Sequence, residues 1–359
     1  MKICYFGDGG SIHIVRWCEH FVALGHEVHL ITFKNVSIPN VQVHFVDTGS
    51  IAQAGGNWKV LLKFREVKRI LKRIKPDVFH AMYATSYGIT GALCNYHPYA
   101  ISTLGTDVLI SPRQSKIYKF LLRFAFKKAD WINTLAPHMS DAVEEIGVDM
   151  KKVEVVPFGI NMKLFNAHGR VENTNKFVVS STRNFELIYN IPHMLKALAL
   201  VQDKIPNLEI RLGGAGSLRA ELEQLVADLK IRNVIFTGKI SQVELVKMLQ
   251  ESNLFISVSL SDGNNLSLVE AMSCGAYCIG TDIPANRLWI DDNKNGMLVK
   301  IDDVQGLADK ILLAYQKYNE LQAEGRMLSA QKINELGNWE VNMKRVEEKY
   351  KEIVKNKDC

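Results

Sequence analysis

The sequence predicts an α/β protein of two Rossmann-like, doubly wound domains, and three observations support this. Strand-like runs of β-branched and apolar residues alternate with helical patterns, as in parallel sheets covered by helices on both faces. The alternation stops at 165–176, "FNAHGRVENTNK", a polar stretch without periodicity, and then restarts. A chain of 359 residues is also long for a single core. We therefore expect domains at 1–167 and 176–337, joined by a linker.

The first domain begins with a βαβ unit. "KICYF" at 2–6 reads as a buried strand, and the glycine turn "GDGGS" follows it. A helical pattern runs from His13 to Leu24 and ends at Gly25, before the next strand "EVHLITF". The later elements repeat this alternation. Strands are expected at 41–46, 77–83, 100–104, 131–136 and 153–159, and helices at 58–74, 86–95, 115–128 and 137–146.

The second domain repeats the same pattern and ends with a helix. Strands are expected at 177–182, 208–214, 233–238, 254–259, 277–282 and 296–299, and helices at 191–203, 217–229, 241–251, 266–273 and 303–317. After "GNW" at 337–339, an amphipathic helix finishes the chain, with apolar positions Val341, Met343, Val346, Tyr350 and Ile353.

The composition indicates an ordinary globular protein. No apolar run reaches the roughly 18–20 residues that span a bilayer, and the run after Lys2 is too short for a secretory signal. Six cysteines are scattered, and "CGAYC" at 274–278 has the wrong spacing for a CxxC pair. These features predict a cytoplasmic protein with reduced cysteines and no structural zinc site.

Positive charge is concentrated in the first half. Residues 1–165 hold 20 Lys and Arg against 13 Asp and Glu, and the remainder holds 24 against 25. The stretches 58–75 and 115–128 combine cations with an apolar stripe, which suits an anionic membrane surface such as the inner face of the cell membrane. The alternative is that both stripes pack on the sheet while the cations are solvated. Nucleic acid is not indicated, because no recognition motif accompanies the modest excess.

Three glycine loops lie where strands lead into helices: "GDGGS" with Gly9 and Gly10, "GGAGS" with Gly214, and "SDGNN" at 261–265. Backbone N–H groups and the helix dipole make such places anion sites. The dinucleotide fingerprint GxGxxG fails in the first two, at Ile12 and Leu218. Phosphate binding is therefore favoured over hydride transfer.

Two carboxylates flank the third loop. Glu270 lies inside the helix expected at 266–273, and a carboxylate there suits the vicinal hydroxyls of a ribose. Asp262, in the loop itself, would meet a different hydroxyl-bearing group. The N–H groups near Gly263, Asn264, Asn265, Leu266 and Ser267 suit a diphosphate. Together these groups describe a nucleotide-sugar site, although Asp262 could instead cap the helix and Glu270 could be solvated.

The stretch 261–299, "SDGNNLSLVEAMSCGAYCIGTDIPANRLWIDDNKNGMLV", resembles the signature region of the retaining family 4 glycosyltransferases, which have the GT-B fold. Similar motifs occur along nearly the whole chain, among them "ALGHEVHLIT", "KPDVFHA", "GTDV", "VEVVPFGINMKLF" and "LEIRLGGAGSLRAELE". The resemblance implies that the two domains face each other across a cleft and that the C-terminal helix, 338–359, crosses back to the first domain. It also implies an acceptor-binding first domain and a nucleotide-sugar-binding second domain.

The resemblance further assigns roles. Glu270 would hold the donor ribose, Asp262 would contact a hydroxyl of the transferred sugar, and Arg183 in "VVSSTRNF" would bind the donor diphosphate. An arginine there stabilises the charge that grows on the leaving phosphate. With the leaving diphosphate itself taking the acceptor's proton, no dedicated base is required. No Asp-x-Asp cluster for a metal is present, so we expect neither a metal nor another cofactor.

The chain departs from the family at three positions: Asp262 replaces a glutamate, Leu104 stands where many relatives have histidine, and no Lys or Arg follows Arg183 before Lys196. His13, Arg16, His80 and Tyr83 are expected on the acceptor side, with Asp107 as a further catalytic candidate. His80 could instead be a packed, hydrogen-bonded core residue.

The sequence thus predicts a retaining transferase acting on a glycan or lipid-linked acceptor. The alternatives are a nucleotide-sugar epimerase of the same fold and a non-catalytic protein that binds sugar nucleotides.

Overall fold

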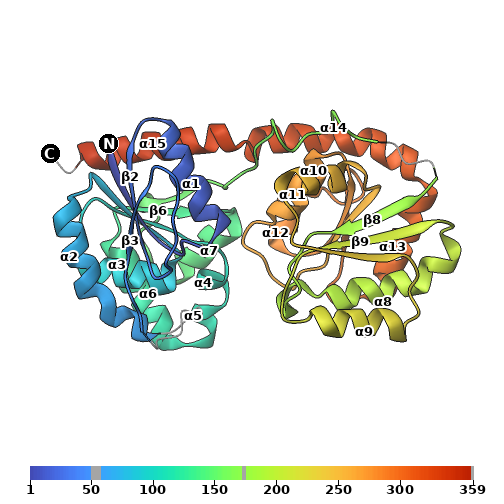
Figure 1. Cartoon of the computed structure of the whole chain (residues 1–359), viewed down its shortest axis with the longest axis horizontal. Coiled ribbons are helices and arrows are strands. Elements are labelled where there is room, and N and C mark those ends of the chain that lie inside the picture. The colour runs from blue at the N-terminus through green and yellow to red at the C-terminus, as the bar shows by residue number, and fades with distance from the viewer. Residues whose placement is uncertain (50–57, 172–174, 357–359) are drawn as a thin grey trace. The chain divides into compact units, whose positions relative to one another are not determined.

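A computed structural model describes residues 1–49, 58–171 and 175–356 (Figure 1). The chain divides into two compact units, each with its own parallel sheet. The first unit contains Met1–Pro157 together with Met343–Cys359, and the second contains Phe158–Asn342. The predicted α/β class with two doubly wound sheets is therefore confirmed, as is the return of the C-terminal helix to the first unit.

The first sheet has strand order β3-β2-β1-β4-β5-β6-β7, and every pairing is parallel. Its strands are β1 (Lys2–Phe6), β2 (Glu27–Thr32), β3 (Gln42–Phe45), β4 (Val78–Met82), β5 (Tyr99–Ser102), β6 (Trp131–Thr134) and β7 (Val153–Val155). The central strands β4, β5 and β6 are completely buried, which explains their continuous apolar runs.

Helices cover both faces of this sheet, with α1 and α15 on one face and α2, α3 and α6 on the other (Figure 1). The helices of this unit are α1 (Ile12–Ala23), α2 (Phe64–Ile74), α3 (Ile89–Cys94), α4 (Thr106–Leu109), α5 (Ser111–Gln114), α6 (Lys116–Lys128), α7 (Pro137–Glu145) and α15 (Trp339–Lys355). The predicted helix 58–74 is 3₁₀ at Trp58–Lys63 before α2 begins, and the predicted helix 86–95 starts as a π-helical turn, Ala84–Gly88.

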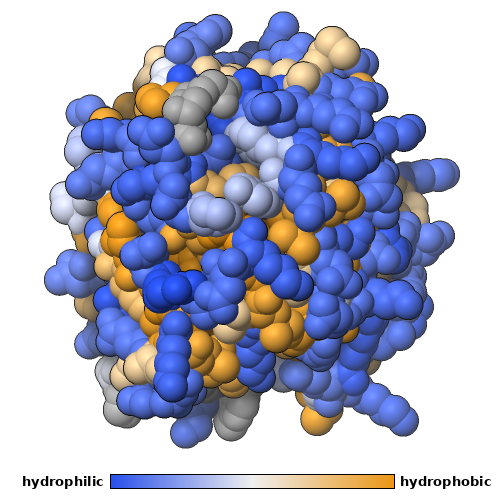
Figure 2. Space-filling view, turned by 90° about the vertical axis from the view of Figure 1, so that its right-hand side faces the viewer, coloured by the Kyte–Doolittle hydropathy of each residue, from blue (hydrophilic) through white to orange (hydrophobic). Residues whose placement is uncertain are grey.

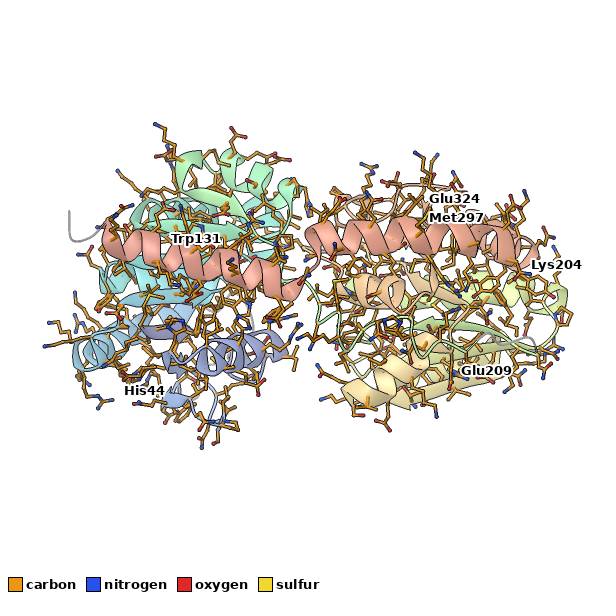
Figure 3. All side chains as sticks on the ribbon, turned by 90° about the horizontal axis from the view of Figure 1, so that it is seen from above. His44, Trp131, Lys204, Glu209, Met297 and Glu324 are labelled. Atoms are coloured by element: carbon orange, nitrogen blue, oxygen red, sulfur yellow. The ribbon has the colours of Figure 1, made fainter. Side chains whose placement is uncertain are left out.

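An aromatic core joins α15 to the first sheet. Tyr350 on α15 packs against Trp131 on β6, with ring centroids 5.9 Å apart. It also packs against Phe21 on α1, at 5.5 Å. Figure 3 labels Trp131, which lies at this helix in that view. Tyr350 and Trp131 are completely buried, so the last helix is part of the core of the first unit.

The second sheet has strand order β10-β9-β8-β11-β12-β13, again all parallel. Its strands are β8 (Phe177–Ser181), β9 (Leu208–Gly213), β10 (Val234–Gly238), β11 (Leu254–Ser257), β12 (Tyr277–Thr281) and β13 (Met297–Val299). The order reverses between β8 and β11. In open α/β sheets, this switch point is where ligands bind, at the carboxyl ends of the strands.

Two groups of helices cover the second sheet, α8, α9 and α13 on one face and α10, α11 and α14 on the other (Figure 1). The helices are α8 (Ile191–Val201), α9 (Arg219–Asp228), α10 (Gln242–Gln250), α11 (Leu266–Ser273), α12 (Pro284–Arg287), α13 (Val304–Gln316) and α14 (Tyr318–Leu336). Local capping fixes several helix starts. Ser241 and Glu244 form a capping box at α10, and Asp303 accepts a hydrogen bond from the Gly306 N–H at α13.

The division between the units differs from the expected linker at 165–176, of which 172–174 lie outside the described residues. The chain enters the second unit already at Phe158. The reason is a close pairing with the end of α14: the Ile160 N–H donates to the Gly337 carbonyl at 2.8 Å, and the Trp339 N–H donates to the Ile160 carbonyl at 3.1 Å. Ile160 and Phe165 are then buried in the core of the second unit.

The helix α14 was not predicted from the sequence. Its apolar residues are few and it lacks a strong amphipathic pattern, but Gln322, Gly325, Ser329 and Ile333 are buried along one side. Small and amide side chains form this buried side, so the usual hydrophobic periodicity is absent.

The face of the molecule shown in Figure 2 is mainly hydrophilic. On the face shown in Figure 2, hydrophobic residues gather in the middle, surrounded by hydrophilic ones. Within the described part of the chain, no helix is both long enough and apolar enough to cross a bilayer.

Candidate functional site

The carboxyl ends of β8 and β11 bring the strongest sequence candidates together. Arg183 follows β8, and the loop 261–265 follows β11 and leads into α11. Nη1 of Arg183 donates to Oδ1 of Asn265 at 2.9 Å and to Oγ of Ser267 at 3.4 Å. Nη2 donates to Oδ2 of Asp262 at 2.6 Å. The guanidinium thus lies against the first turn of α11, at the switch point of the second sheet.

Asn265 fixes the start of α11. Its side chain accepts a hydrogen bond from the Leu268 N–H as the N-cap, and its Nδ2 donates to Ser257 Oγ and to Asn286 Oδ1, both at 2.8 Å. Asn265 is completely buried, so its side chain holds Arg183 and the loop in place from within. Asn286 on α12 was not among the sequence candidates, although it lies in the motif "TDIPANRLW".

The neighbouring residues shape the same loop. Oδ1 of Asn264 accepts a hydrogen bond from Nε1 of the buried Trp289 at 3.0 Å. The Leu266 N–H donates to the Asn264 carbonyl at 2.8 Å, and Gly263 is buried. The expected ligand contacts of Gly263, Asn264 and Leu266 remain predictions, because what the structure shows for these residues is the anchoring of the loop.

Buried polar atoms without a hydrogen-bond partner gather around this edge. Among the described residues they include Ser181 Oγ, Thr182 Oγ1, Arg183 Nε, Ser259 Oγ and Asn264 Nδ2. All five follow or end β8 and β11. Buried polar groups are almost always hydrogen-bonded in folded proteins, and each unsatisfied one costs about 1–3 kcal/mol. This concentration indicates a place where a polar ligand, or water in its absence, supplies partners.

Glu270 lies half-buried on α11, three residues after Ser267 and therefore on the same side of the helix. The expected pair of carboxylates, Asp262 and Glu270, is thus placed with one residue ahead of the helix and one within it. Asp262 contacts Arg183 directly.

The glycine loop after β9 differs from the prediction that Gly214 binds substrate. The Gly214 N–H donates to the Gly238 carbonyl at 2.9 Å, so it is not offered to a ligand. A Cβ at Gly214 would lie 2.8 Å from the Arg183 carbonyl oxygen, and its φ is +146°. The glycine is needed for this close approach to Arg183. The Glu186 carboxylate accepts hydrogen bonds from both the Ser217 N–H (2.9 Å) and the Ser217 hydroxyl (2.6 Å), and these bonds lower its pKa.

The first glycine loop is also closed by its own side chains. The Gly9 N–H donates to Oγ1 of Thr32 at 2.9 Å, and the Gly10 N–H donates to Oδ1 of Asp8 at 2.9 Å. Asp8 in turn pairs with Lys34 at 2.9 Å. Both N–H groups are thus bonded within the chain in this conformation, and the contact of Gly9 and Gly10 with substrate stays a prediction. His13 and Arg16 lie half-buried, one turn apart on α1.

His80 is a core residue, and the prediction that it contacts substrate is wrong. It is completely buried on β4, and its ring nitrogens are hydrogen-bonded to Tyr350 Oη (2.5 Å) and Ser102 Oγ (2.9 Å). Burial lowers its pKa to about 3, so the ring is neutral at pH 7. This is the packed alternative that the sequence left open.

Asp107 is completely buried as well, and it holds two loops together instead of facing a substrate. Its carboxylate accepts hydrogen bonds from the Ala84 N–H (2.7 Å) after β4 and the Gly105 N–H (2.8 Å) after β5, and also from the Leu104 N–H. Burial raises its pKa, while these N–H donors oppose that shift. Tyr83, held at φ +95° and half-buried, meets Thr106 Oγ1 with its hydroxyl at 2.9 Å. The predicted catalytic role of Asp107 is thus replaced by a structural one.

One aromatic residue at the candidate site was missed. The ring of Tyr189 lies over the guanidinium of Arg183, with Cζ 4.1 Å from the ring centroid. A sequence signal existed only as an aromatic residue six positions after Arg183. For metals, no group of three or more His, Cys, Asp or Glu side chains in residues 1–49, 58–171 and 175–356 is arranged to hold an ion.

Comparison with known families matches both halves of the chain. The model described as "Glycosyl transferase 4-like" matches residues 2–134, and the model described as "Glycosyl transferases group 1" matches residues 163–326. The chain belongs to the group 1 glycosyltransferases. The residues that the second family model matches include Arg183, Asp262 and Glu270.

Individual relatives of this glycosyltransferase are distant but extend over most of its length. It is 24% identical to the N-acetyl-alpha-D-glucosaminyl L-malate synthase of Bacillus anthracis over 328 residues, covering 86% of this chain and 85% of that protein. The structure of sucrose-phosphate synthase from Thermosynechococcus elongatus superposes with a TM-score of 0.85 at 18% identity, covering 99% of this chain and 100% of that chain. The structure of Anabaena HepE in complex with UDP-glucose superposes with a TM-score of 0.80 at 15% sequence identity. The match covers 98% of this chain and 100% of that chain. The structural likenesses show that this glycosyltransferase has the GT-B fold.

Proposed function

We propose that this glycosyltransferase binds a nucleoside diphosphate sugar at the carboxyl edge of the second sheet and transfers the sugar, with retention, to a hydroxyl group. The observation that carries the proposal is the cluster at the switch point. A buried arginine lies against the start of α11, and its Nε and four neighbouring buried polar atoms lack hydrogen-bond partners among the described residues. A cation, a helix start and unsatisfied donors suit a diphosphate.

Residue roles follow from the placement. The diphosphate would lie between Arg183 and the first turn of α11, with Ser267 as a further donor. Glu270, one turn into α11, would accept hydrogen bonds from the ribose hydroxyls. Asp262 would turn from Arg183 to a hydroxyl of the sugar. In relatives, UDP and UDP-glucose are found with HepE, which shares this fold. A UDP-sugar is therefore the first donor to test.

The reaction would need no dedicated base. The bond between the anomeric carbon and the donor phosphate oxygen breaks, and the acceptor oxygen forms a bond to that carbon on the same face of the sugar. The acceptor's proton passes to the departing phosphate oxygen. Arg183 and the α11 dipole stabilise the negative charge that develops on the leaving diphosphate, so we propose that the reaction proceeds without a metal or other cofactor.

For the acceptor, we propose a glycan precursor held at an anionic membrane surface, which would place the protein on the cytoplasmic side of the cell membrane. The apolar stripe of α2 packs inward, with Val67, Leu71 and Ile74 buried. On α6, however, Ile117 and Phe120 are 72% and 71% exposed. They stand beside cationic residues, which suits insertion among anionic head groups. The exposed cations of α6 are Lys116, Lys119, Arg123 and Lys127.

The test begins with binding and proceeds to turnover. Thermal unfolding with a panel of UDP-, GDP-, ADP- and CMP-sugars identifies the donor, because ligands stabilise the folded state in proportion to their affinity. Transfer to polyprenyl-linked and free glycan acceptors is then followed by NMR of the product's anomeric proton. An α-linked product from an α-linked donor supports retention, and an inverted product contradicts it.

The same assay separates the alternatives. An epimerase would convert the donor to a second nucleotide sugar when no acceptor is present. Nucleotide binding without turnover across the acceptor panel would instead indicate a non-catalytic protein. Absence of binding by any nucleotide sugar in the panel would overturn the donor site.

A further inference from the structure

The planar guanidinium group of Arg183 is contacted on its flat face as well as through its in-plane N–H groups. Its Nη atoms point to Asp262, Asn265 and Ser267, while its flat face lies over the ring of Tyr189, with 4.1 Å between Cζ and the ring centroid. Tyr189 lies in the 3₁₀ turn Leu187–Tyr189, within the stretch that the group 1 model matches, and its place over the arginine was not predicted from the sequence. Its position therefore requires an explanation of its own.

We infer that Tyr189 is a positioning residue: its ring fixes the plane of the Arg183 guanidinium toward the start of α11 while the guanidinium exchanges Asp262 for the donor diphosphate. The inference rests on the proposed function. An aromatic face attracts a cation through its quadrupole and accepts none of the in-plane N–H bonds. All five N–H donors of the arginine therefore stay available for oxygen acceptors.

The turn that carries Tyr189 is anchored on two sides. The Leu260 N–H, after β11, donates to the Ile188 carbonyl at 2.8 Å. On the other side, Glu186 accepts two hydrogen bonds from Ser217. The Tyr189 N–H closes the turn by donating to the Glu186 carbonyl at 2.9 Å. The turn that carries the ring is thus tied to the segment after β11 and to the segment after β9.

The charge of the site explains why orientation matters. No Lys or Arg lies between Arg183 and Lys196 in the sequence, so the segment after β8 contributes a single permanent cation. The arginine is only 8% exposed, and its Nε has no hydrogen-bond partner among the described residues. One cation must then meet both phosphates, and planar, bidentate contact depends on the direction of the guanidinium plane.

The experiment compares Tyr189→Phe with Tyr189→Leu. The phenyl ring keeps the face and leucine removes it. With UDP and uridine as probes in titration calorimetry, we expect Tyr189→Phe to match the parent within about twofold. We expect Tyr189→Leu to weaken UDP binding by about 3- to 10-fold and to leave uridine binding unchanged, in keeping with cation–π energies. Turnover of UDP-glucose, or of the donor found above, should fall by about tenfold in the leucine variant.

A matched control removes a similar contact elsewhere in the unit. Phe236→Leu takes away the ring that lies 4.5 Å from Cζ of Arg219, and UDP binding should not change. Thermal unfolding establishes that each variant is folded. Equal UDP affinity and turnover in Tyr189→Leu and Tyr189→Phe would overturn the inference, as would an equal loss of UDP and uridine binding in the leucine variant.

A donor-independent measurement separates this inference from the proposed function. The Nε–H resonance of Arg183 should carry a ring-current shift in the parent and in Tyr189→Phe, and should move in Tyr189→Leu. An unmoved resonance overturns the positioning role. If the parent binds no nucleotide while the resonance moves as expected, the proposed function fails and the contact itself stands.

Discussion

Nη2 of Arg183 lies 2.6 Å from Oδ2 of Asp262, and the two side chains are 8% and 15% exposed. The carboxylate therefore occupies one edge of the cation that we assign to the donor diphosphate. Taking one partner away from such a shielded pair leaves a costly unpaired charge. An incoming diphosphate can replace the carboxylate at the cation, which releases Asp262 toward the sugar.

Mutation of either member of this pair should lower sugar transfer, but the two variants should differ in how they bind the nucleotide. Asp262→Asn removes the internal competitor for Arg183, so UDP should bind about 3- to 10-fold more tightly while sugar transfer falls. Arg183→Ala should lower turnover by about 100-fold or more, with much less effect on uridine binding. Titration calorimetry and initial rates check both. Weaker UDP binding in Asp262→Asn would contradict the exchange of partners.

Glu270 should recognise the ribose. Glu270→Ala removes an acceptor of charge-assisted hydrogen bonds, each contributing about 1.5–3 kcal/mol, and UDP affinity should fall by about 10- to 100-fold. The parent should bind 2′-deoxy-UDP more weakly than UDP, and the variant should bind the two nearly equally. Glu320→Ala, which removes an exposed acid on α14, is the control. Preserved discrimination between the two nucleotides in Glu270→Ala would place the ribose elsewhere.

Asp107 should matter for stability. Asp107→Asn places an amide NH2 where a carboxylate oxygen now accepts the Ala84 or the Gly105 N–H, leaving a buried donor unpaired. The free energy of unfolding should fall by about 1–3 kcal/mol in urea titrations. Asp141→Asn, at an exposed position on α7, should change it little. An unaltered unfolding midpoint in Asp107→Asn would show that the two loops do not depend on this carboxylate.

The surface of α6 should bind anionic vesicles. The double variant Ile117→Ser/Phe120→Ser should lose most of its cosedimentation with phosphatidylglycerol vesicles, and added salt should weaken binding by the parent. Val243 is 73% exposed on α10 and serves as the apolar control through Val243→Ser. Binding to neutral phosphatidylcholine vesicles at equal strength would argue against recognition of anionic lipid.

Stability should depend on pH through His80. Its pKa is about 3 in the folded protein and near 6.5 when unfolded. As the pH falls below about 6.5, the imidazole of His80 becomes protonated in the unfolded chain but stays neutral in the folded protein. The contribution of neutral His80 to the free energy of unfolding is thus fully present above about pH 6.5. It is lost toward pH 3, by up to about 1.4 kcal/mol per pH unit. Urea titrations from pH 7.5 to 4.5 should show a shallower loss in His80→Asn than in the parent.

The two parallel sheets could largely be predicted from the sequence, because buried parallel strands appear as continuous apolar runs. β4, β8 and β12 are buried along their whole length, and all were predicted. The helix α14 was missed because its buried side consists of residues such as Gln322, Gly325 and Ser329, which carry no hydrophobic period. The linker was misplaced because Ile160 joins the second unit through a pairing more than 170 residues away in sequence.

The candidate site was predictable only in part, for a related reason. Asp262 could be proposed from residue type and its place in the loop ahead of a helix, whereas Arg183 was proposed from the resemblance to known glycosyltransferases. Whether a backbone N–H is already bonded cannot be seen in a glycine pattern, and the loops at Gly9 and Gly214 proved to be satisfied internally. His80 and Asp107 have chemically versatile side chains, but both are sealed in the core. Tyr189 acts through the face of its ring, for which no sequence motif exists.

The position of Tyr350 in the chain also affects when the first unit can fold during synthesis. Tyr350 packs against His80 and Trp131 from α15, more than 200 residues further along the chain, so the strands that carry these two residues leave the ribosome with that patch uncovered. Domains generally fold as units, N-terminal first, during synthesis. Here the strands that are made first complete their core only after α15 has been made, and a chain truncated before α15 would expose the apolar surface that Tyr350 covers.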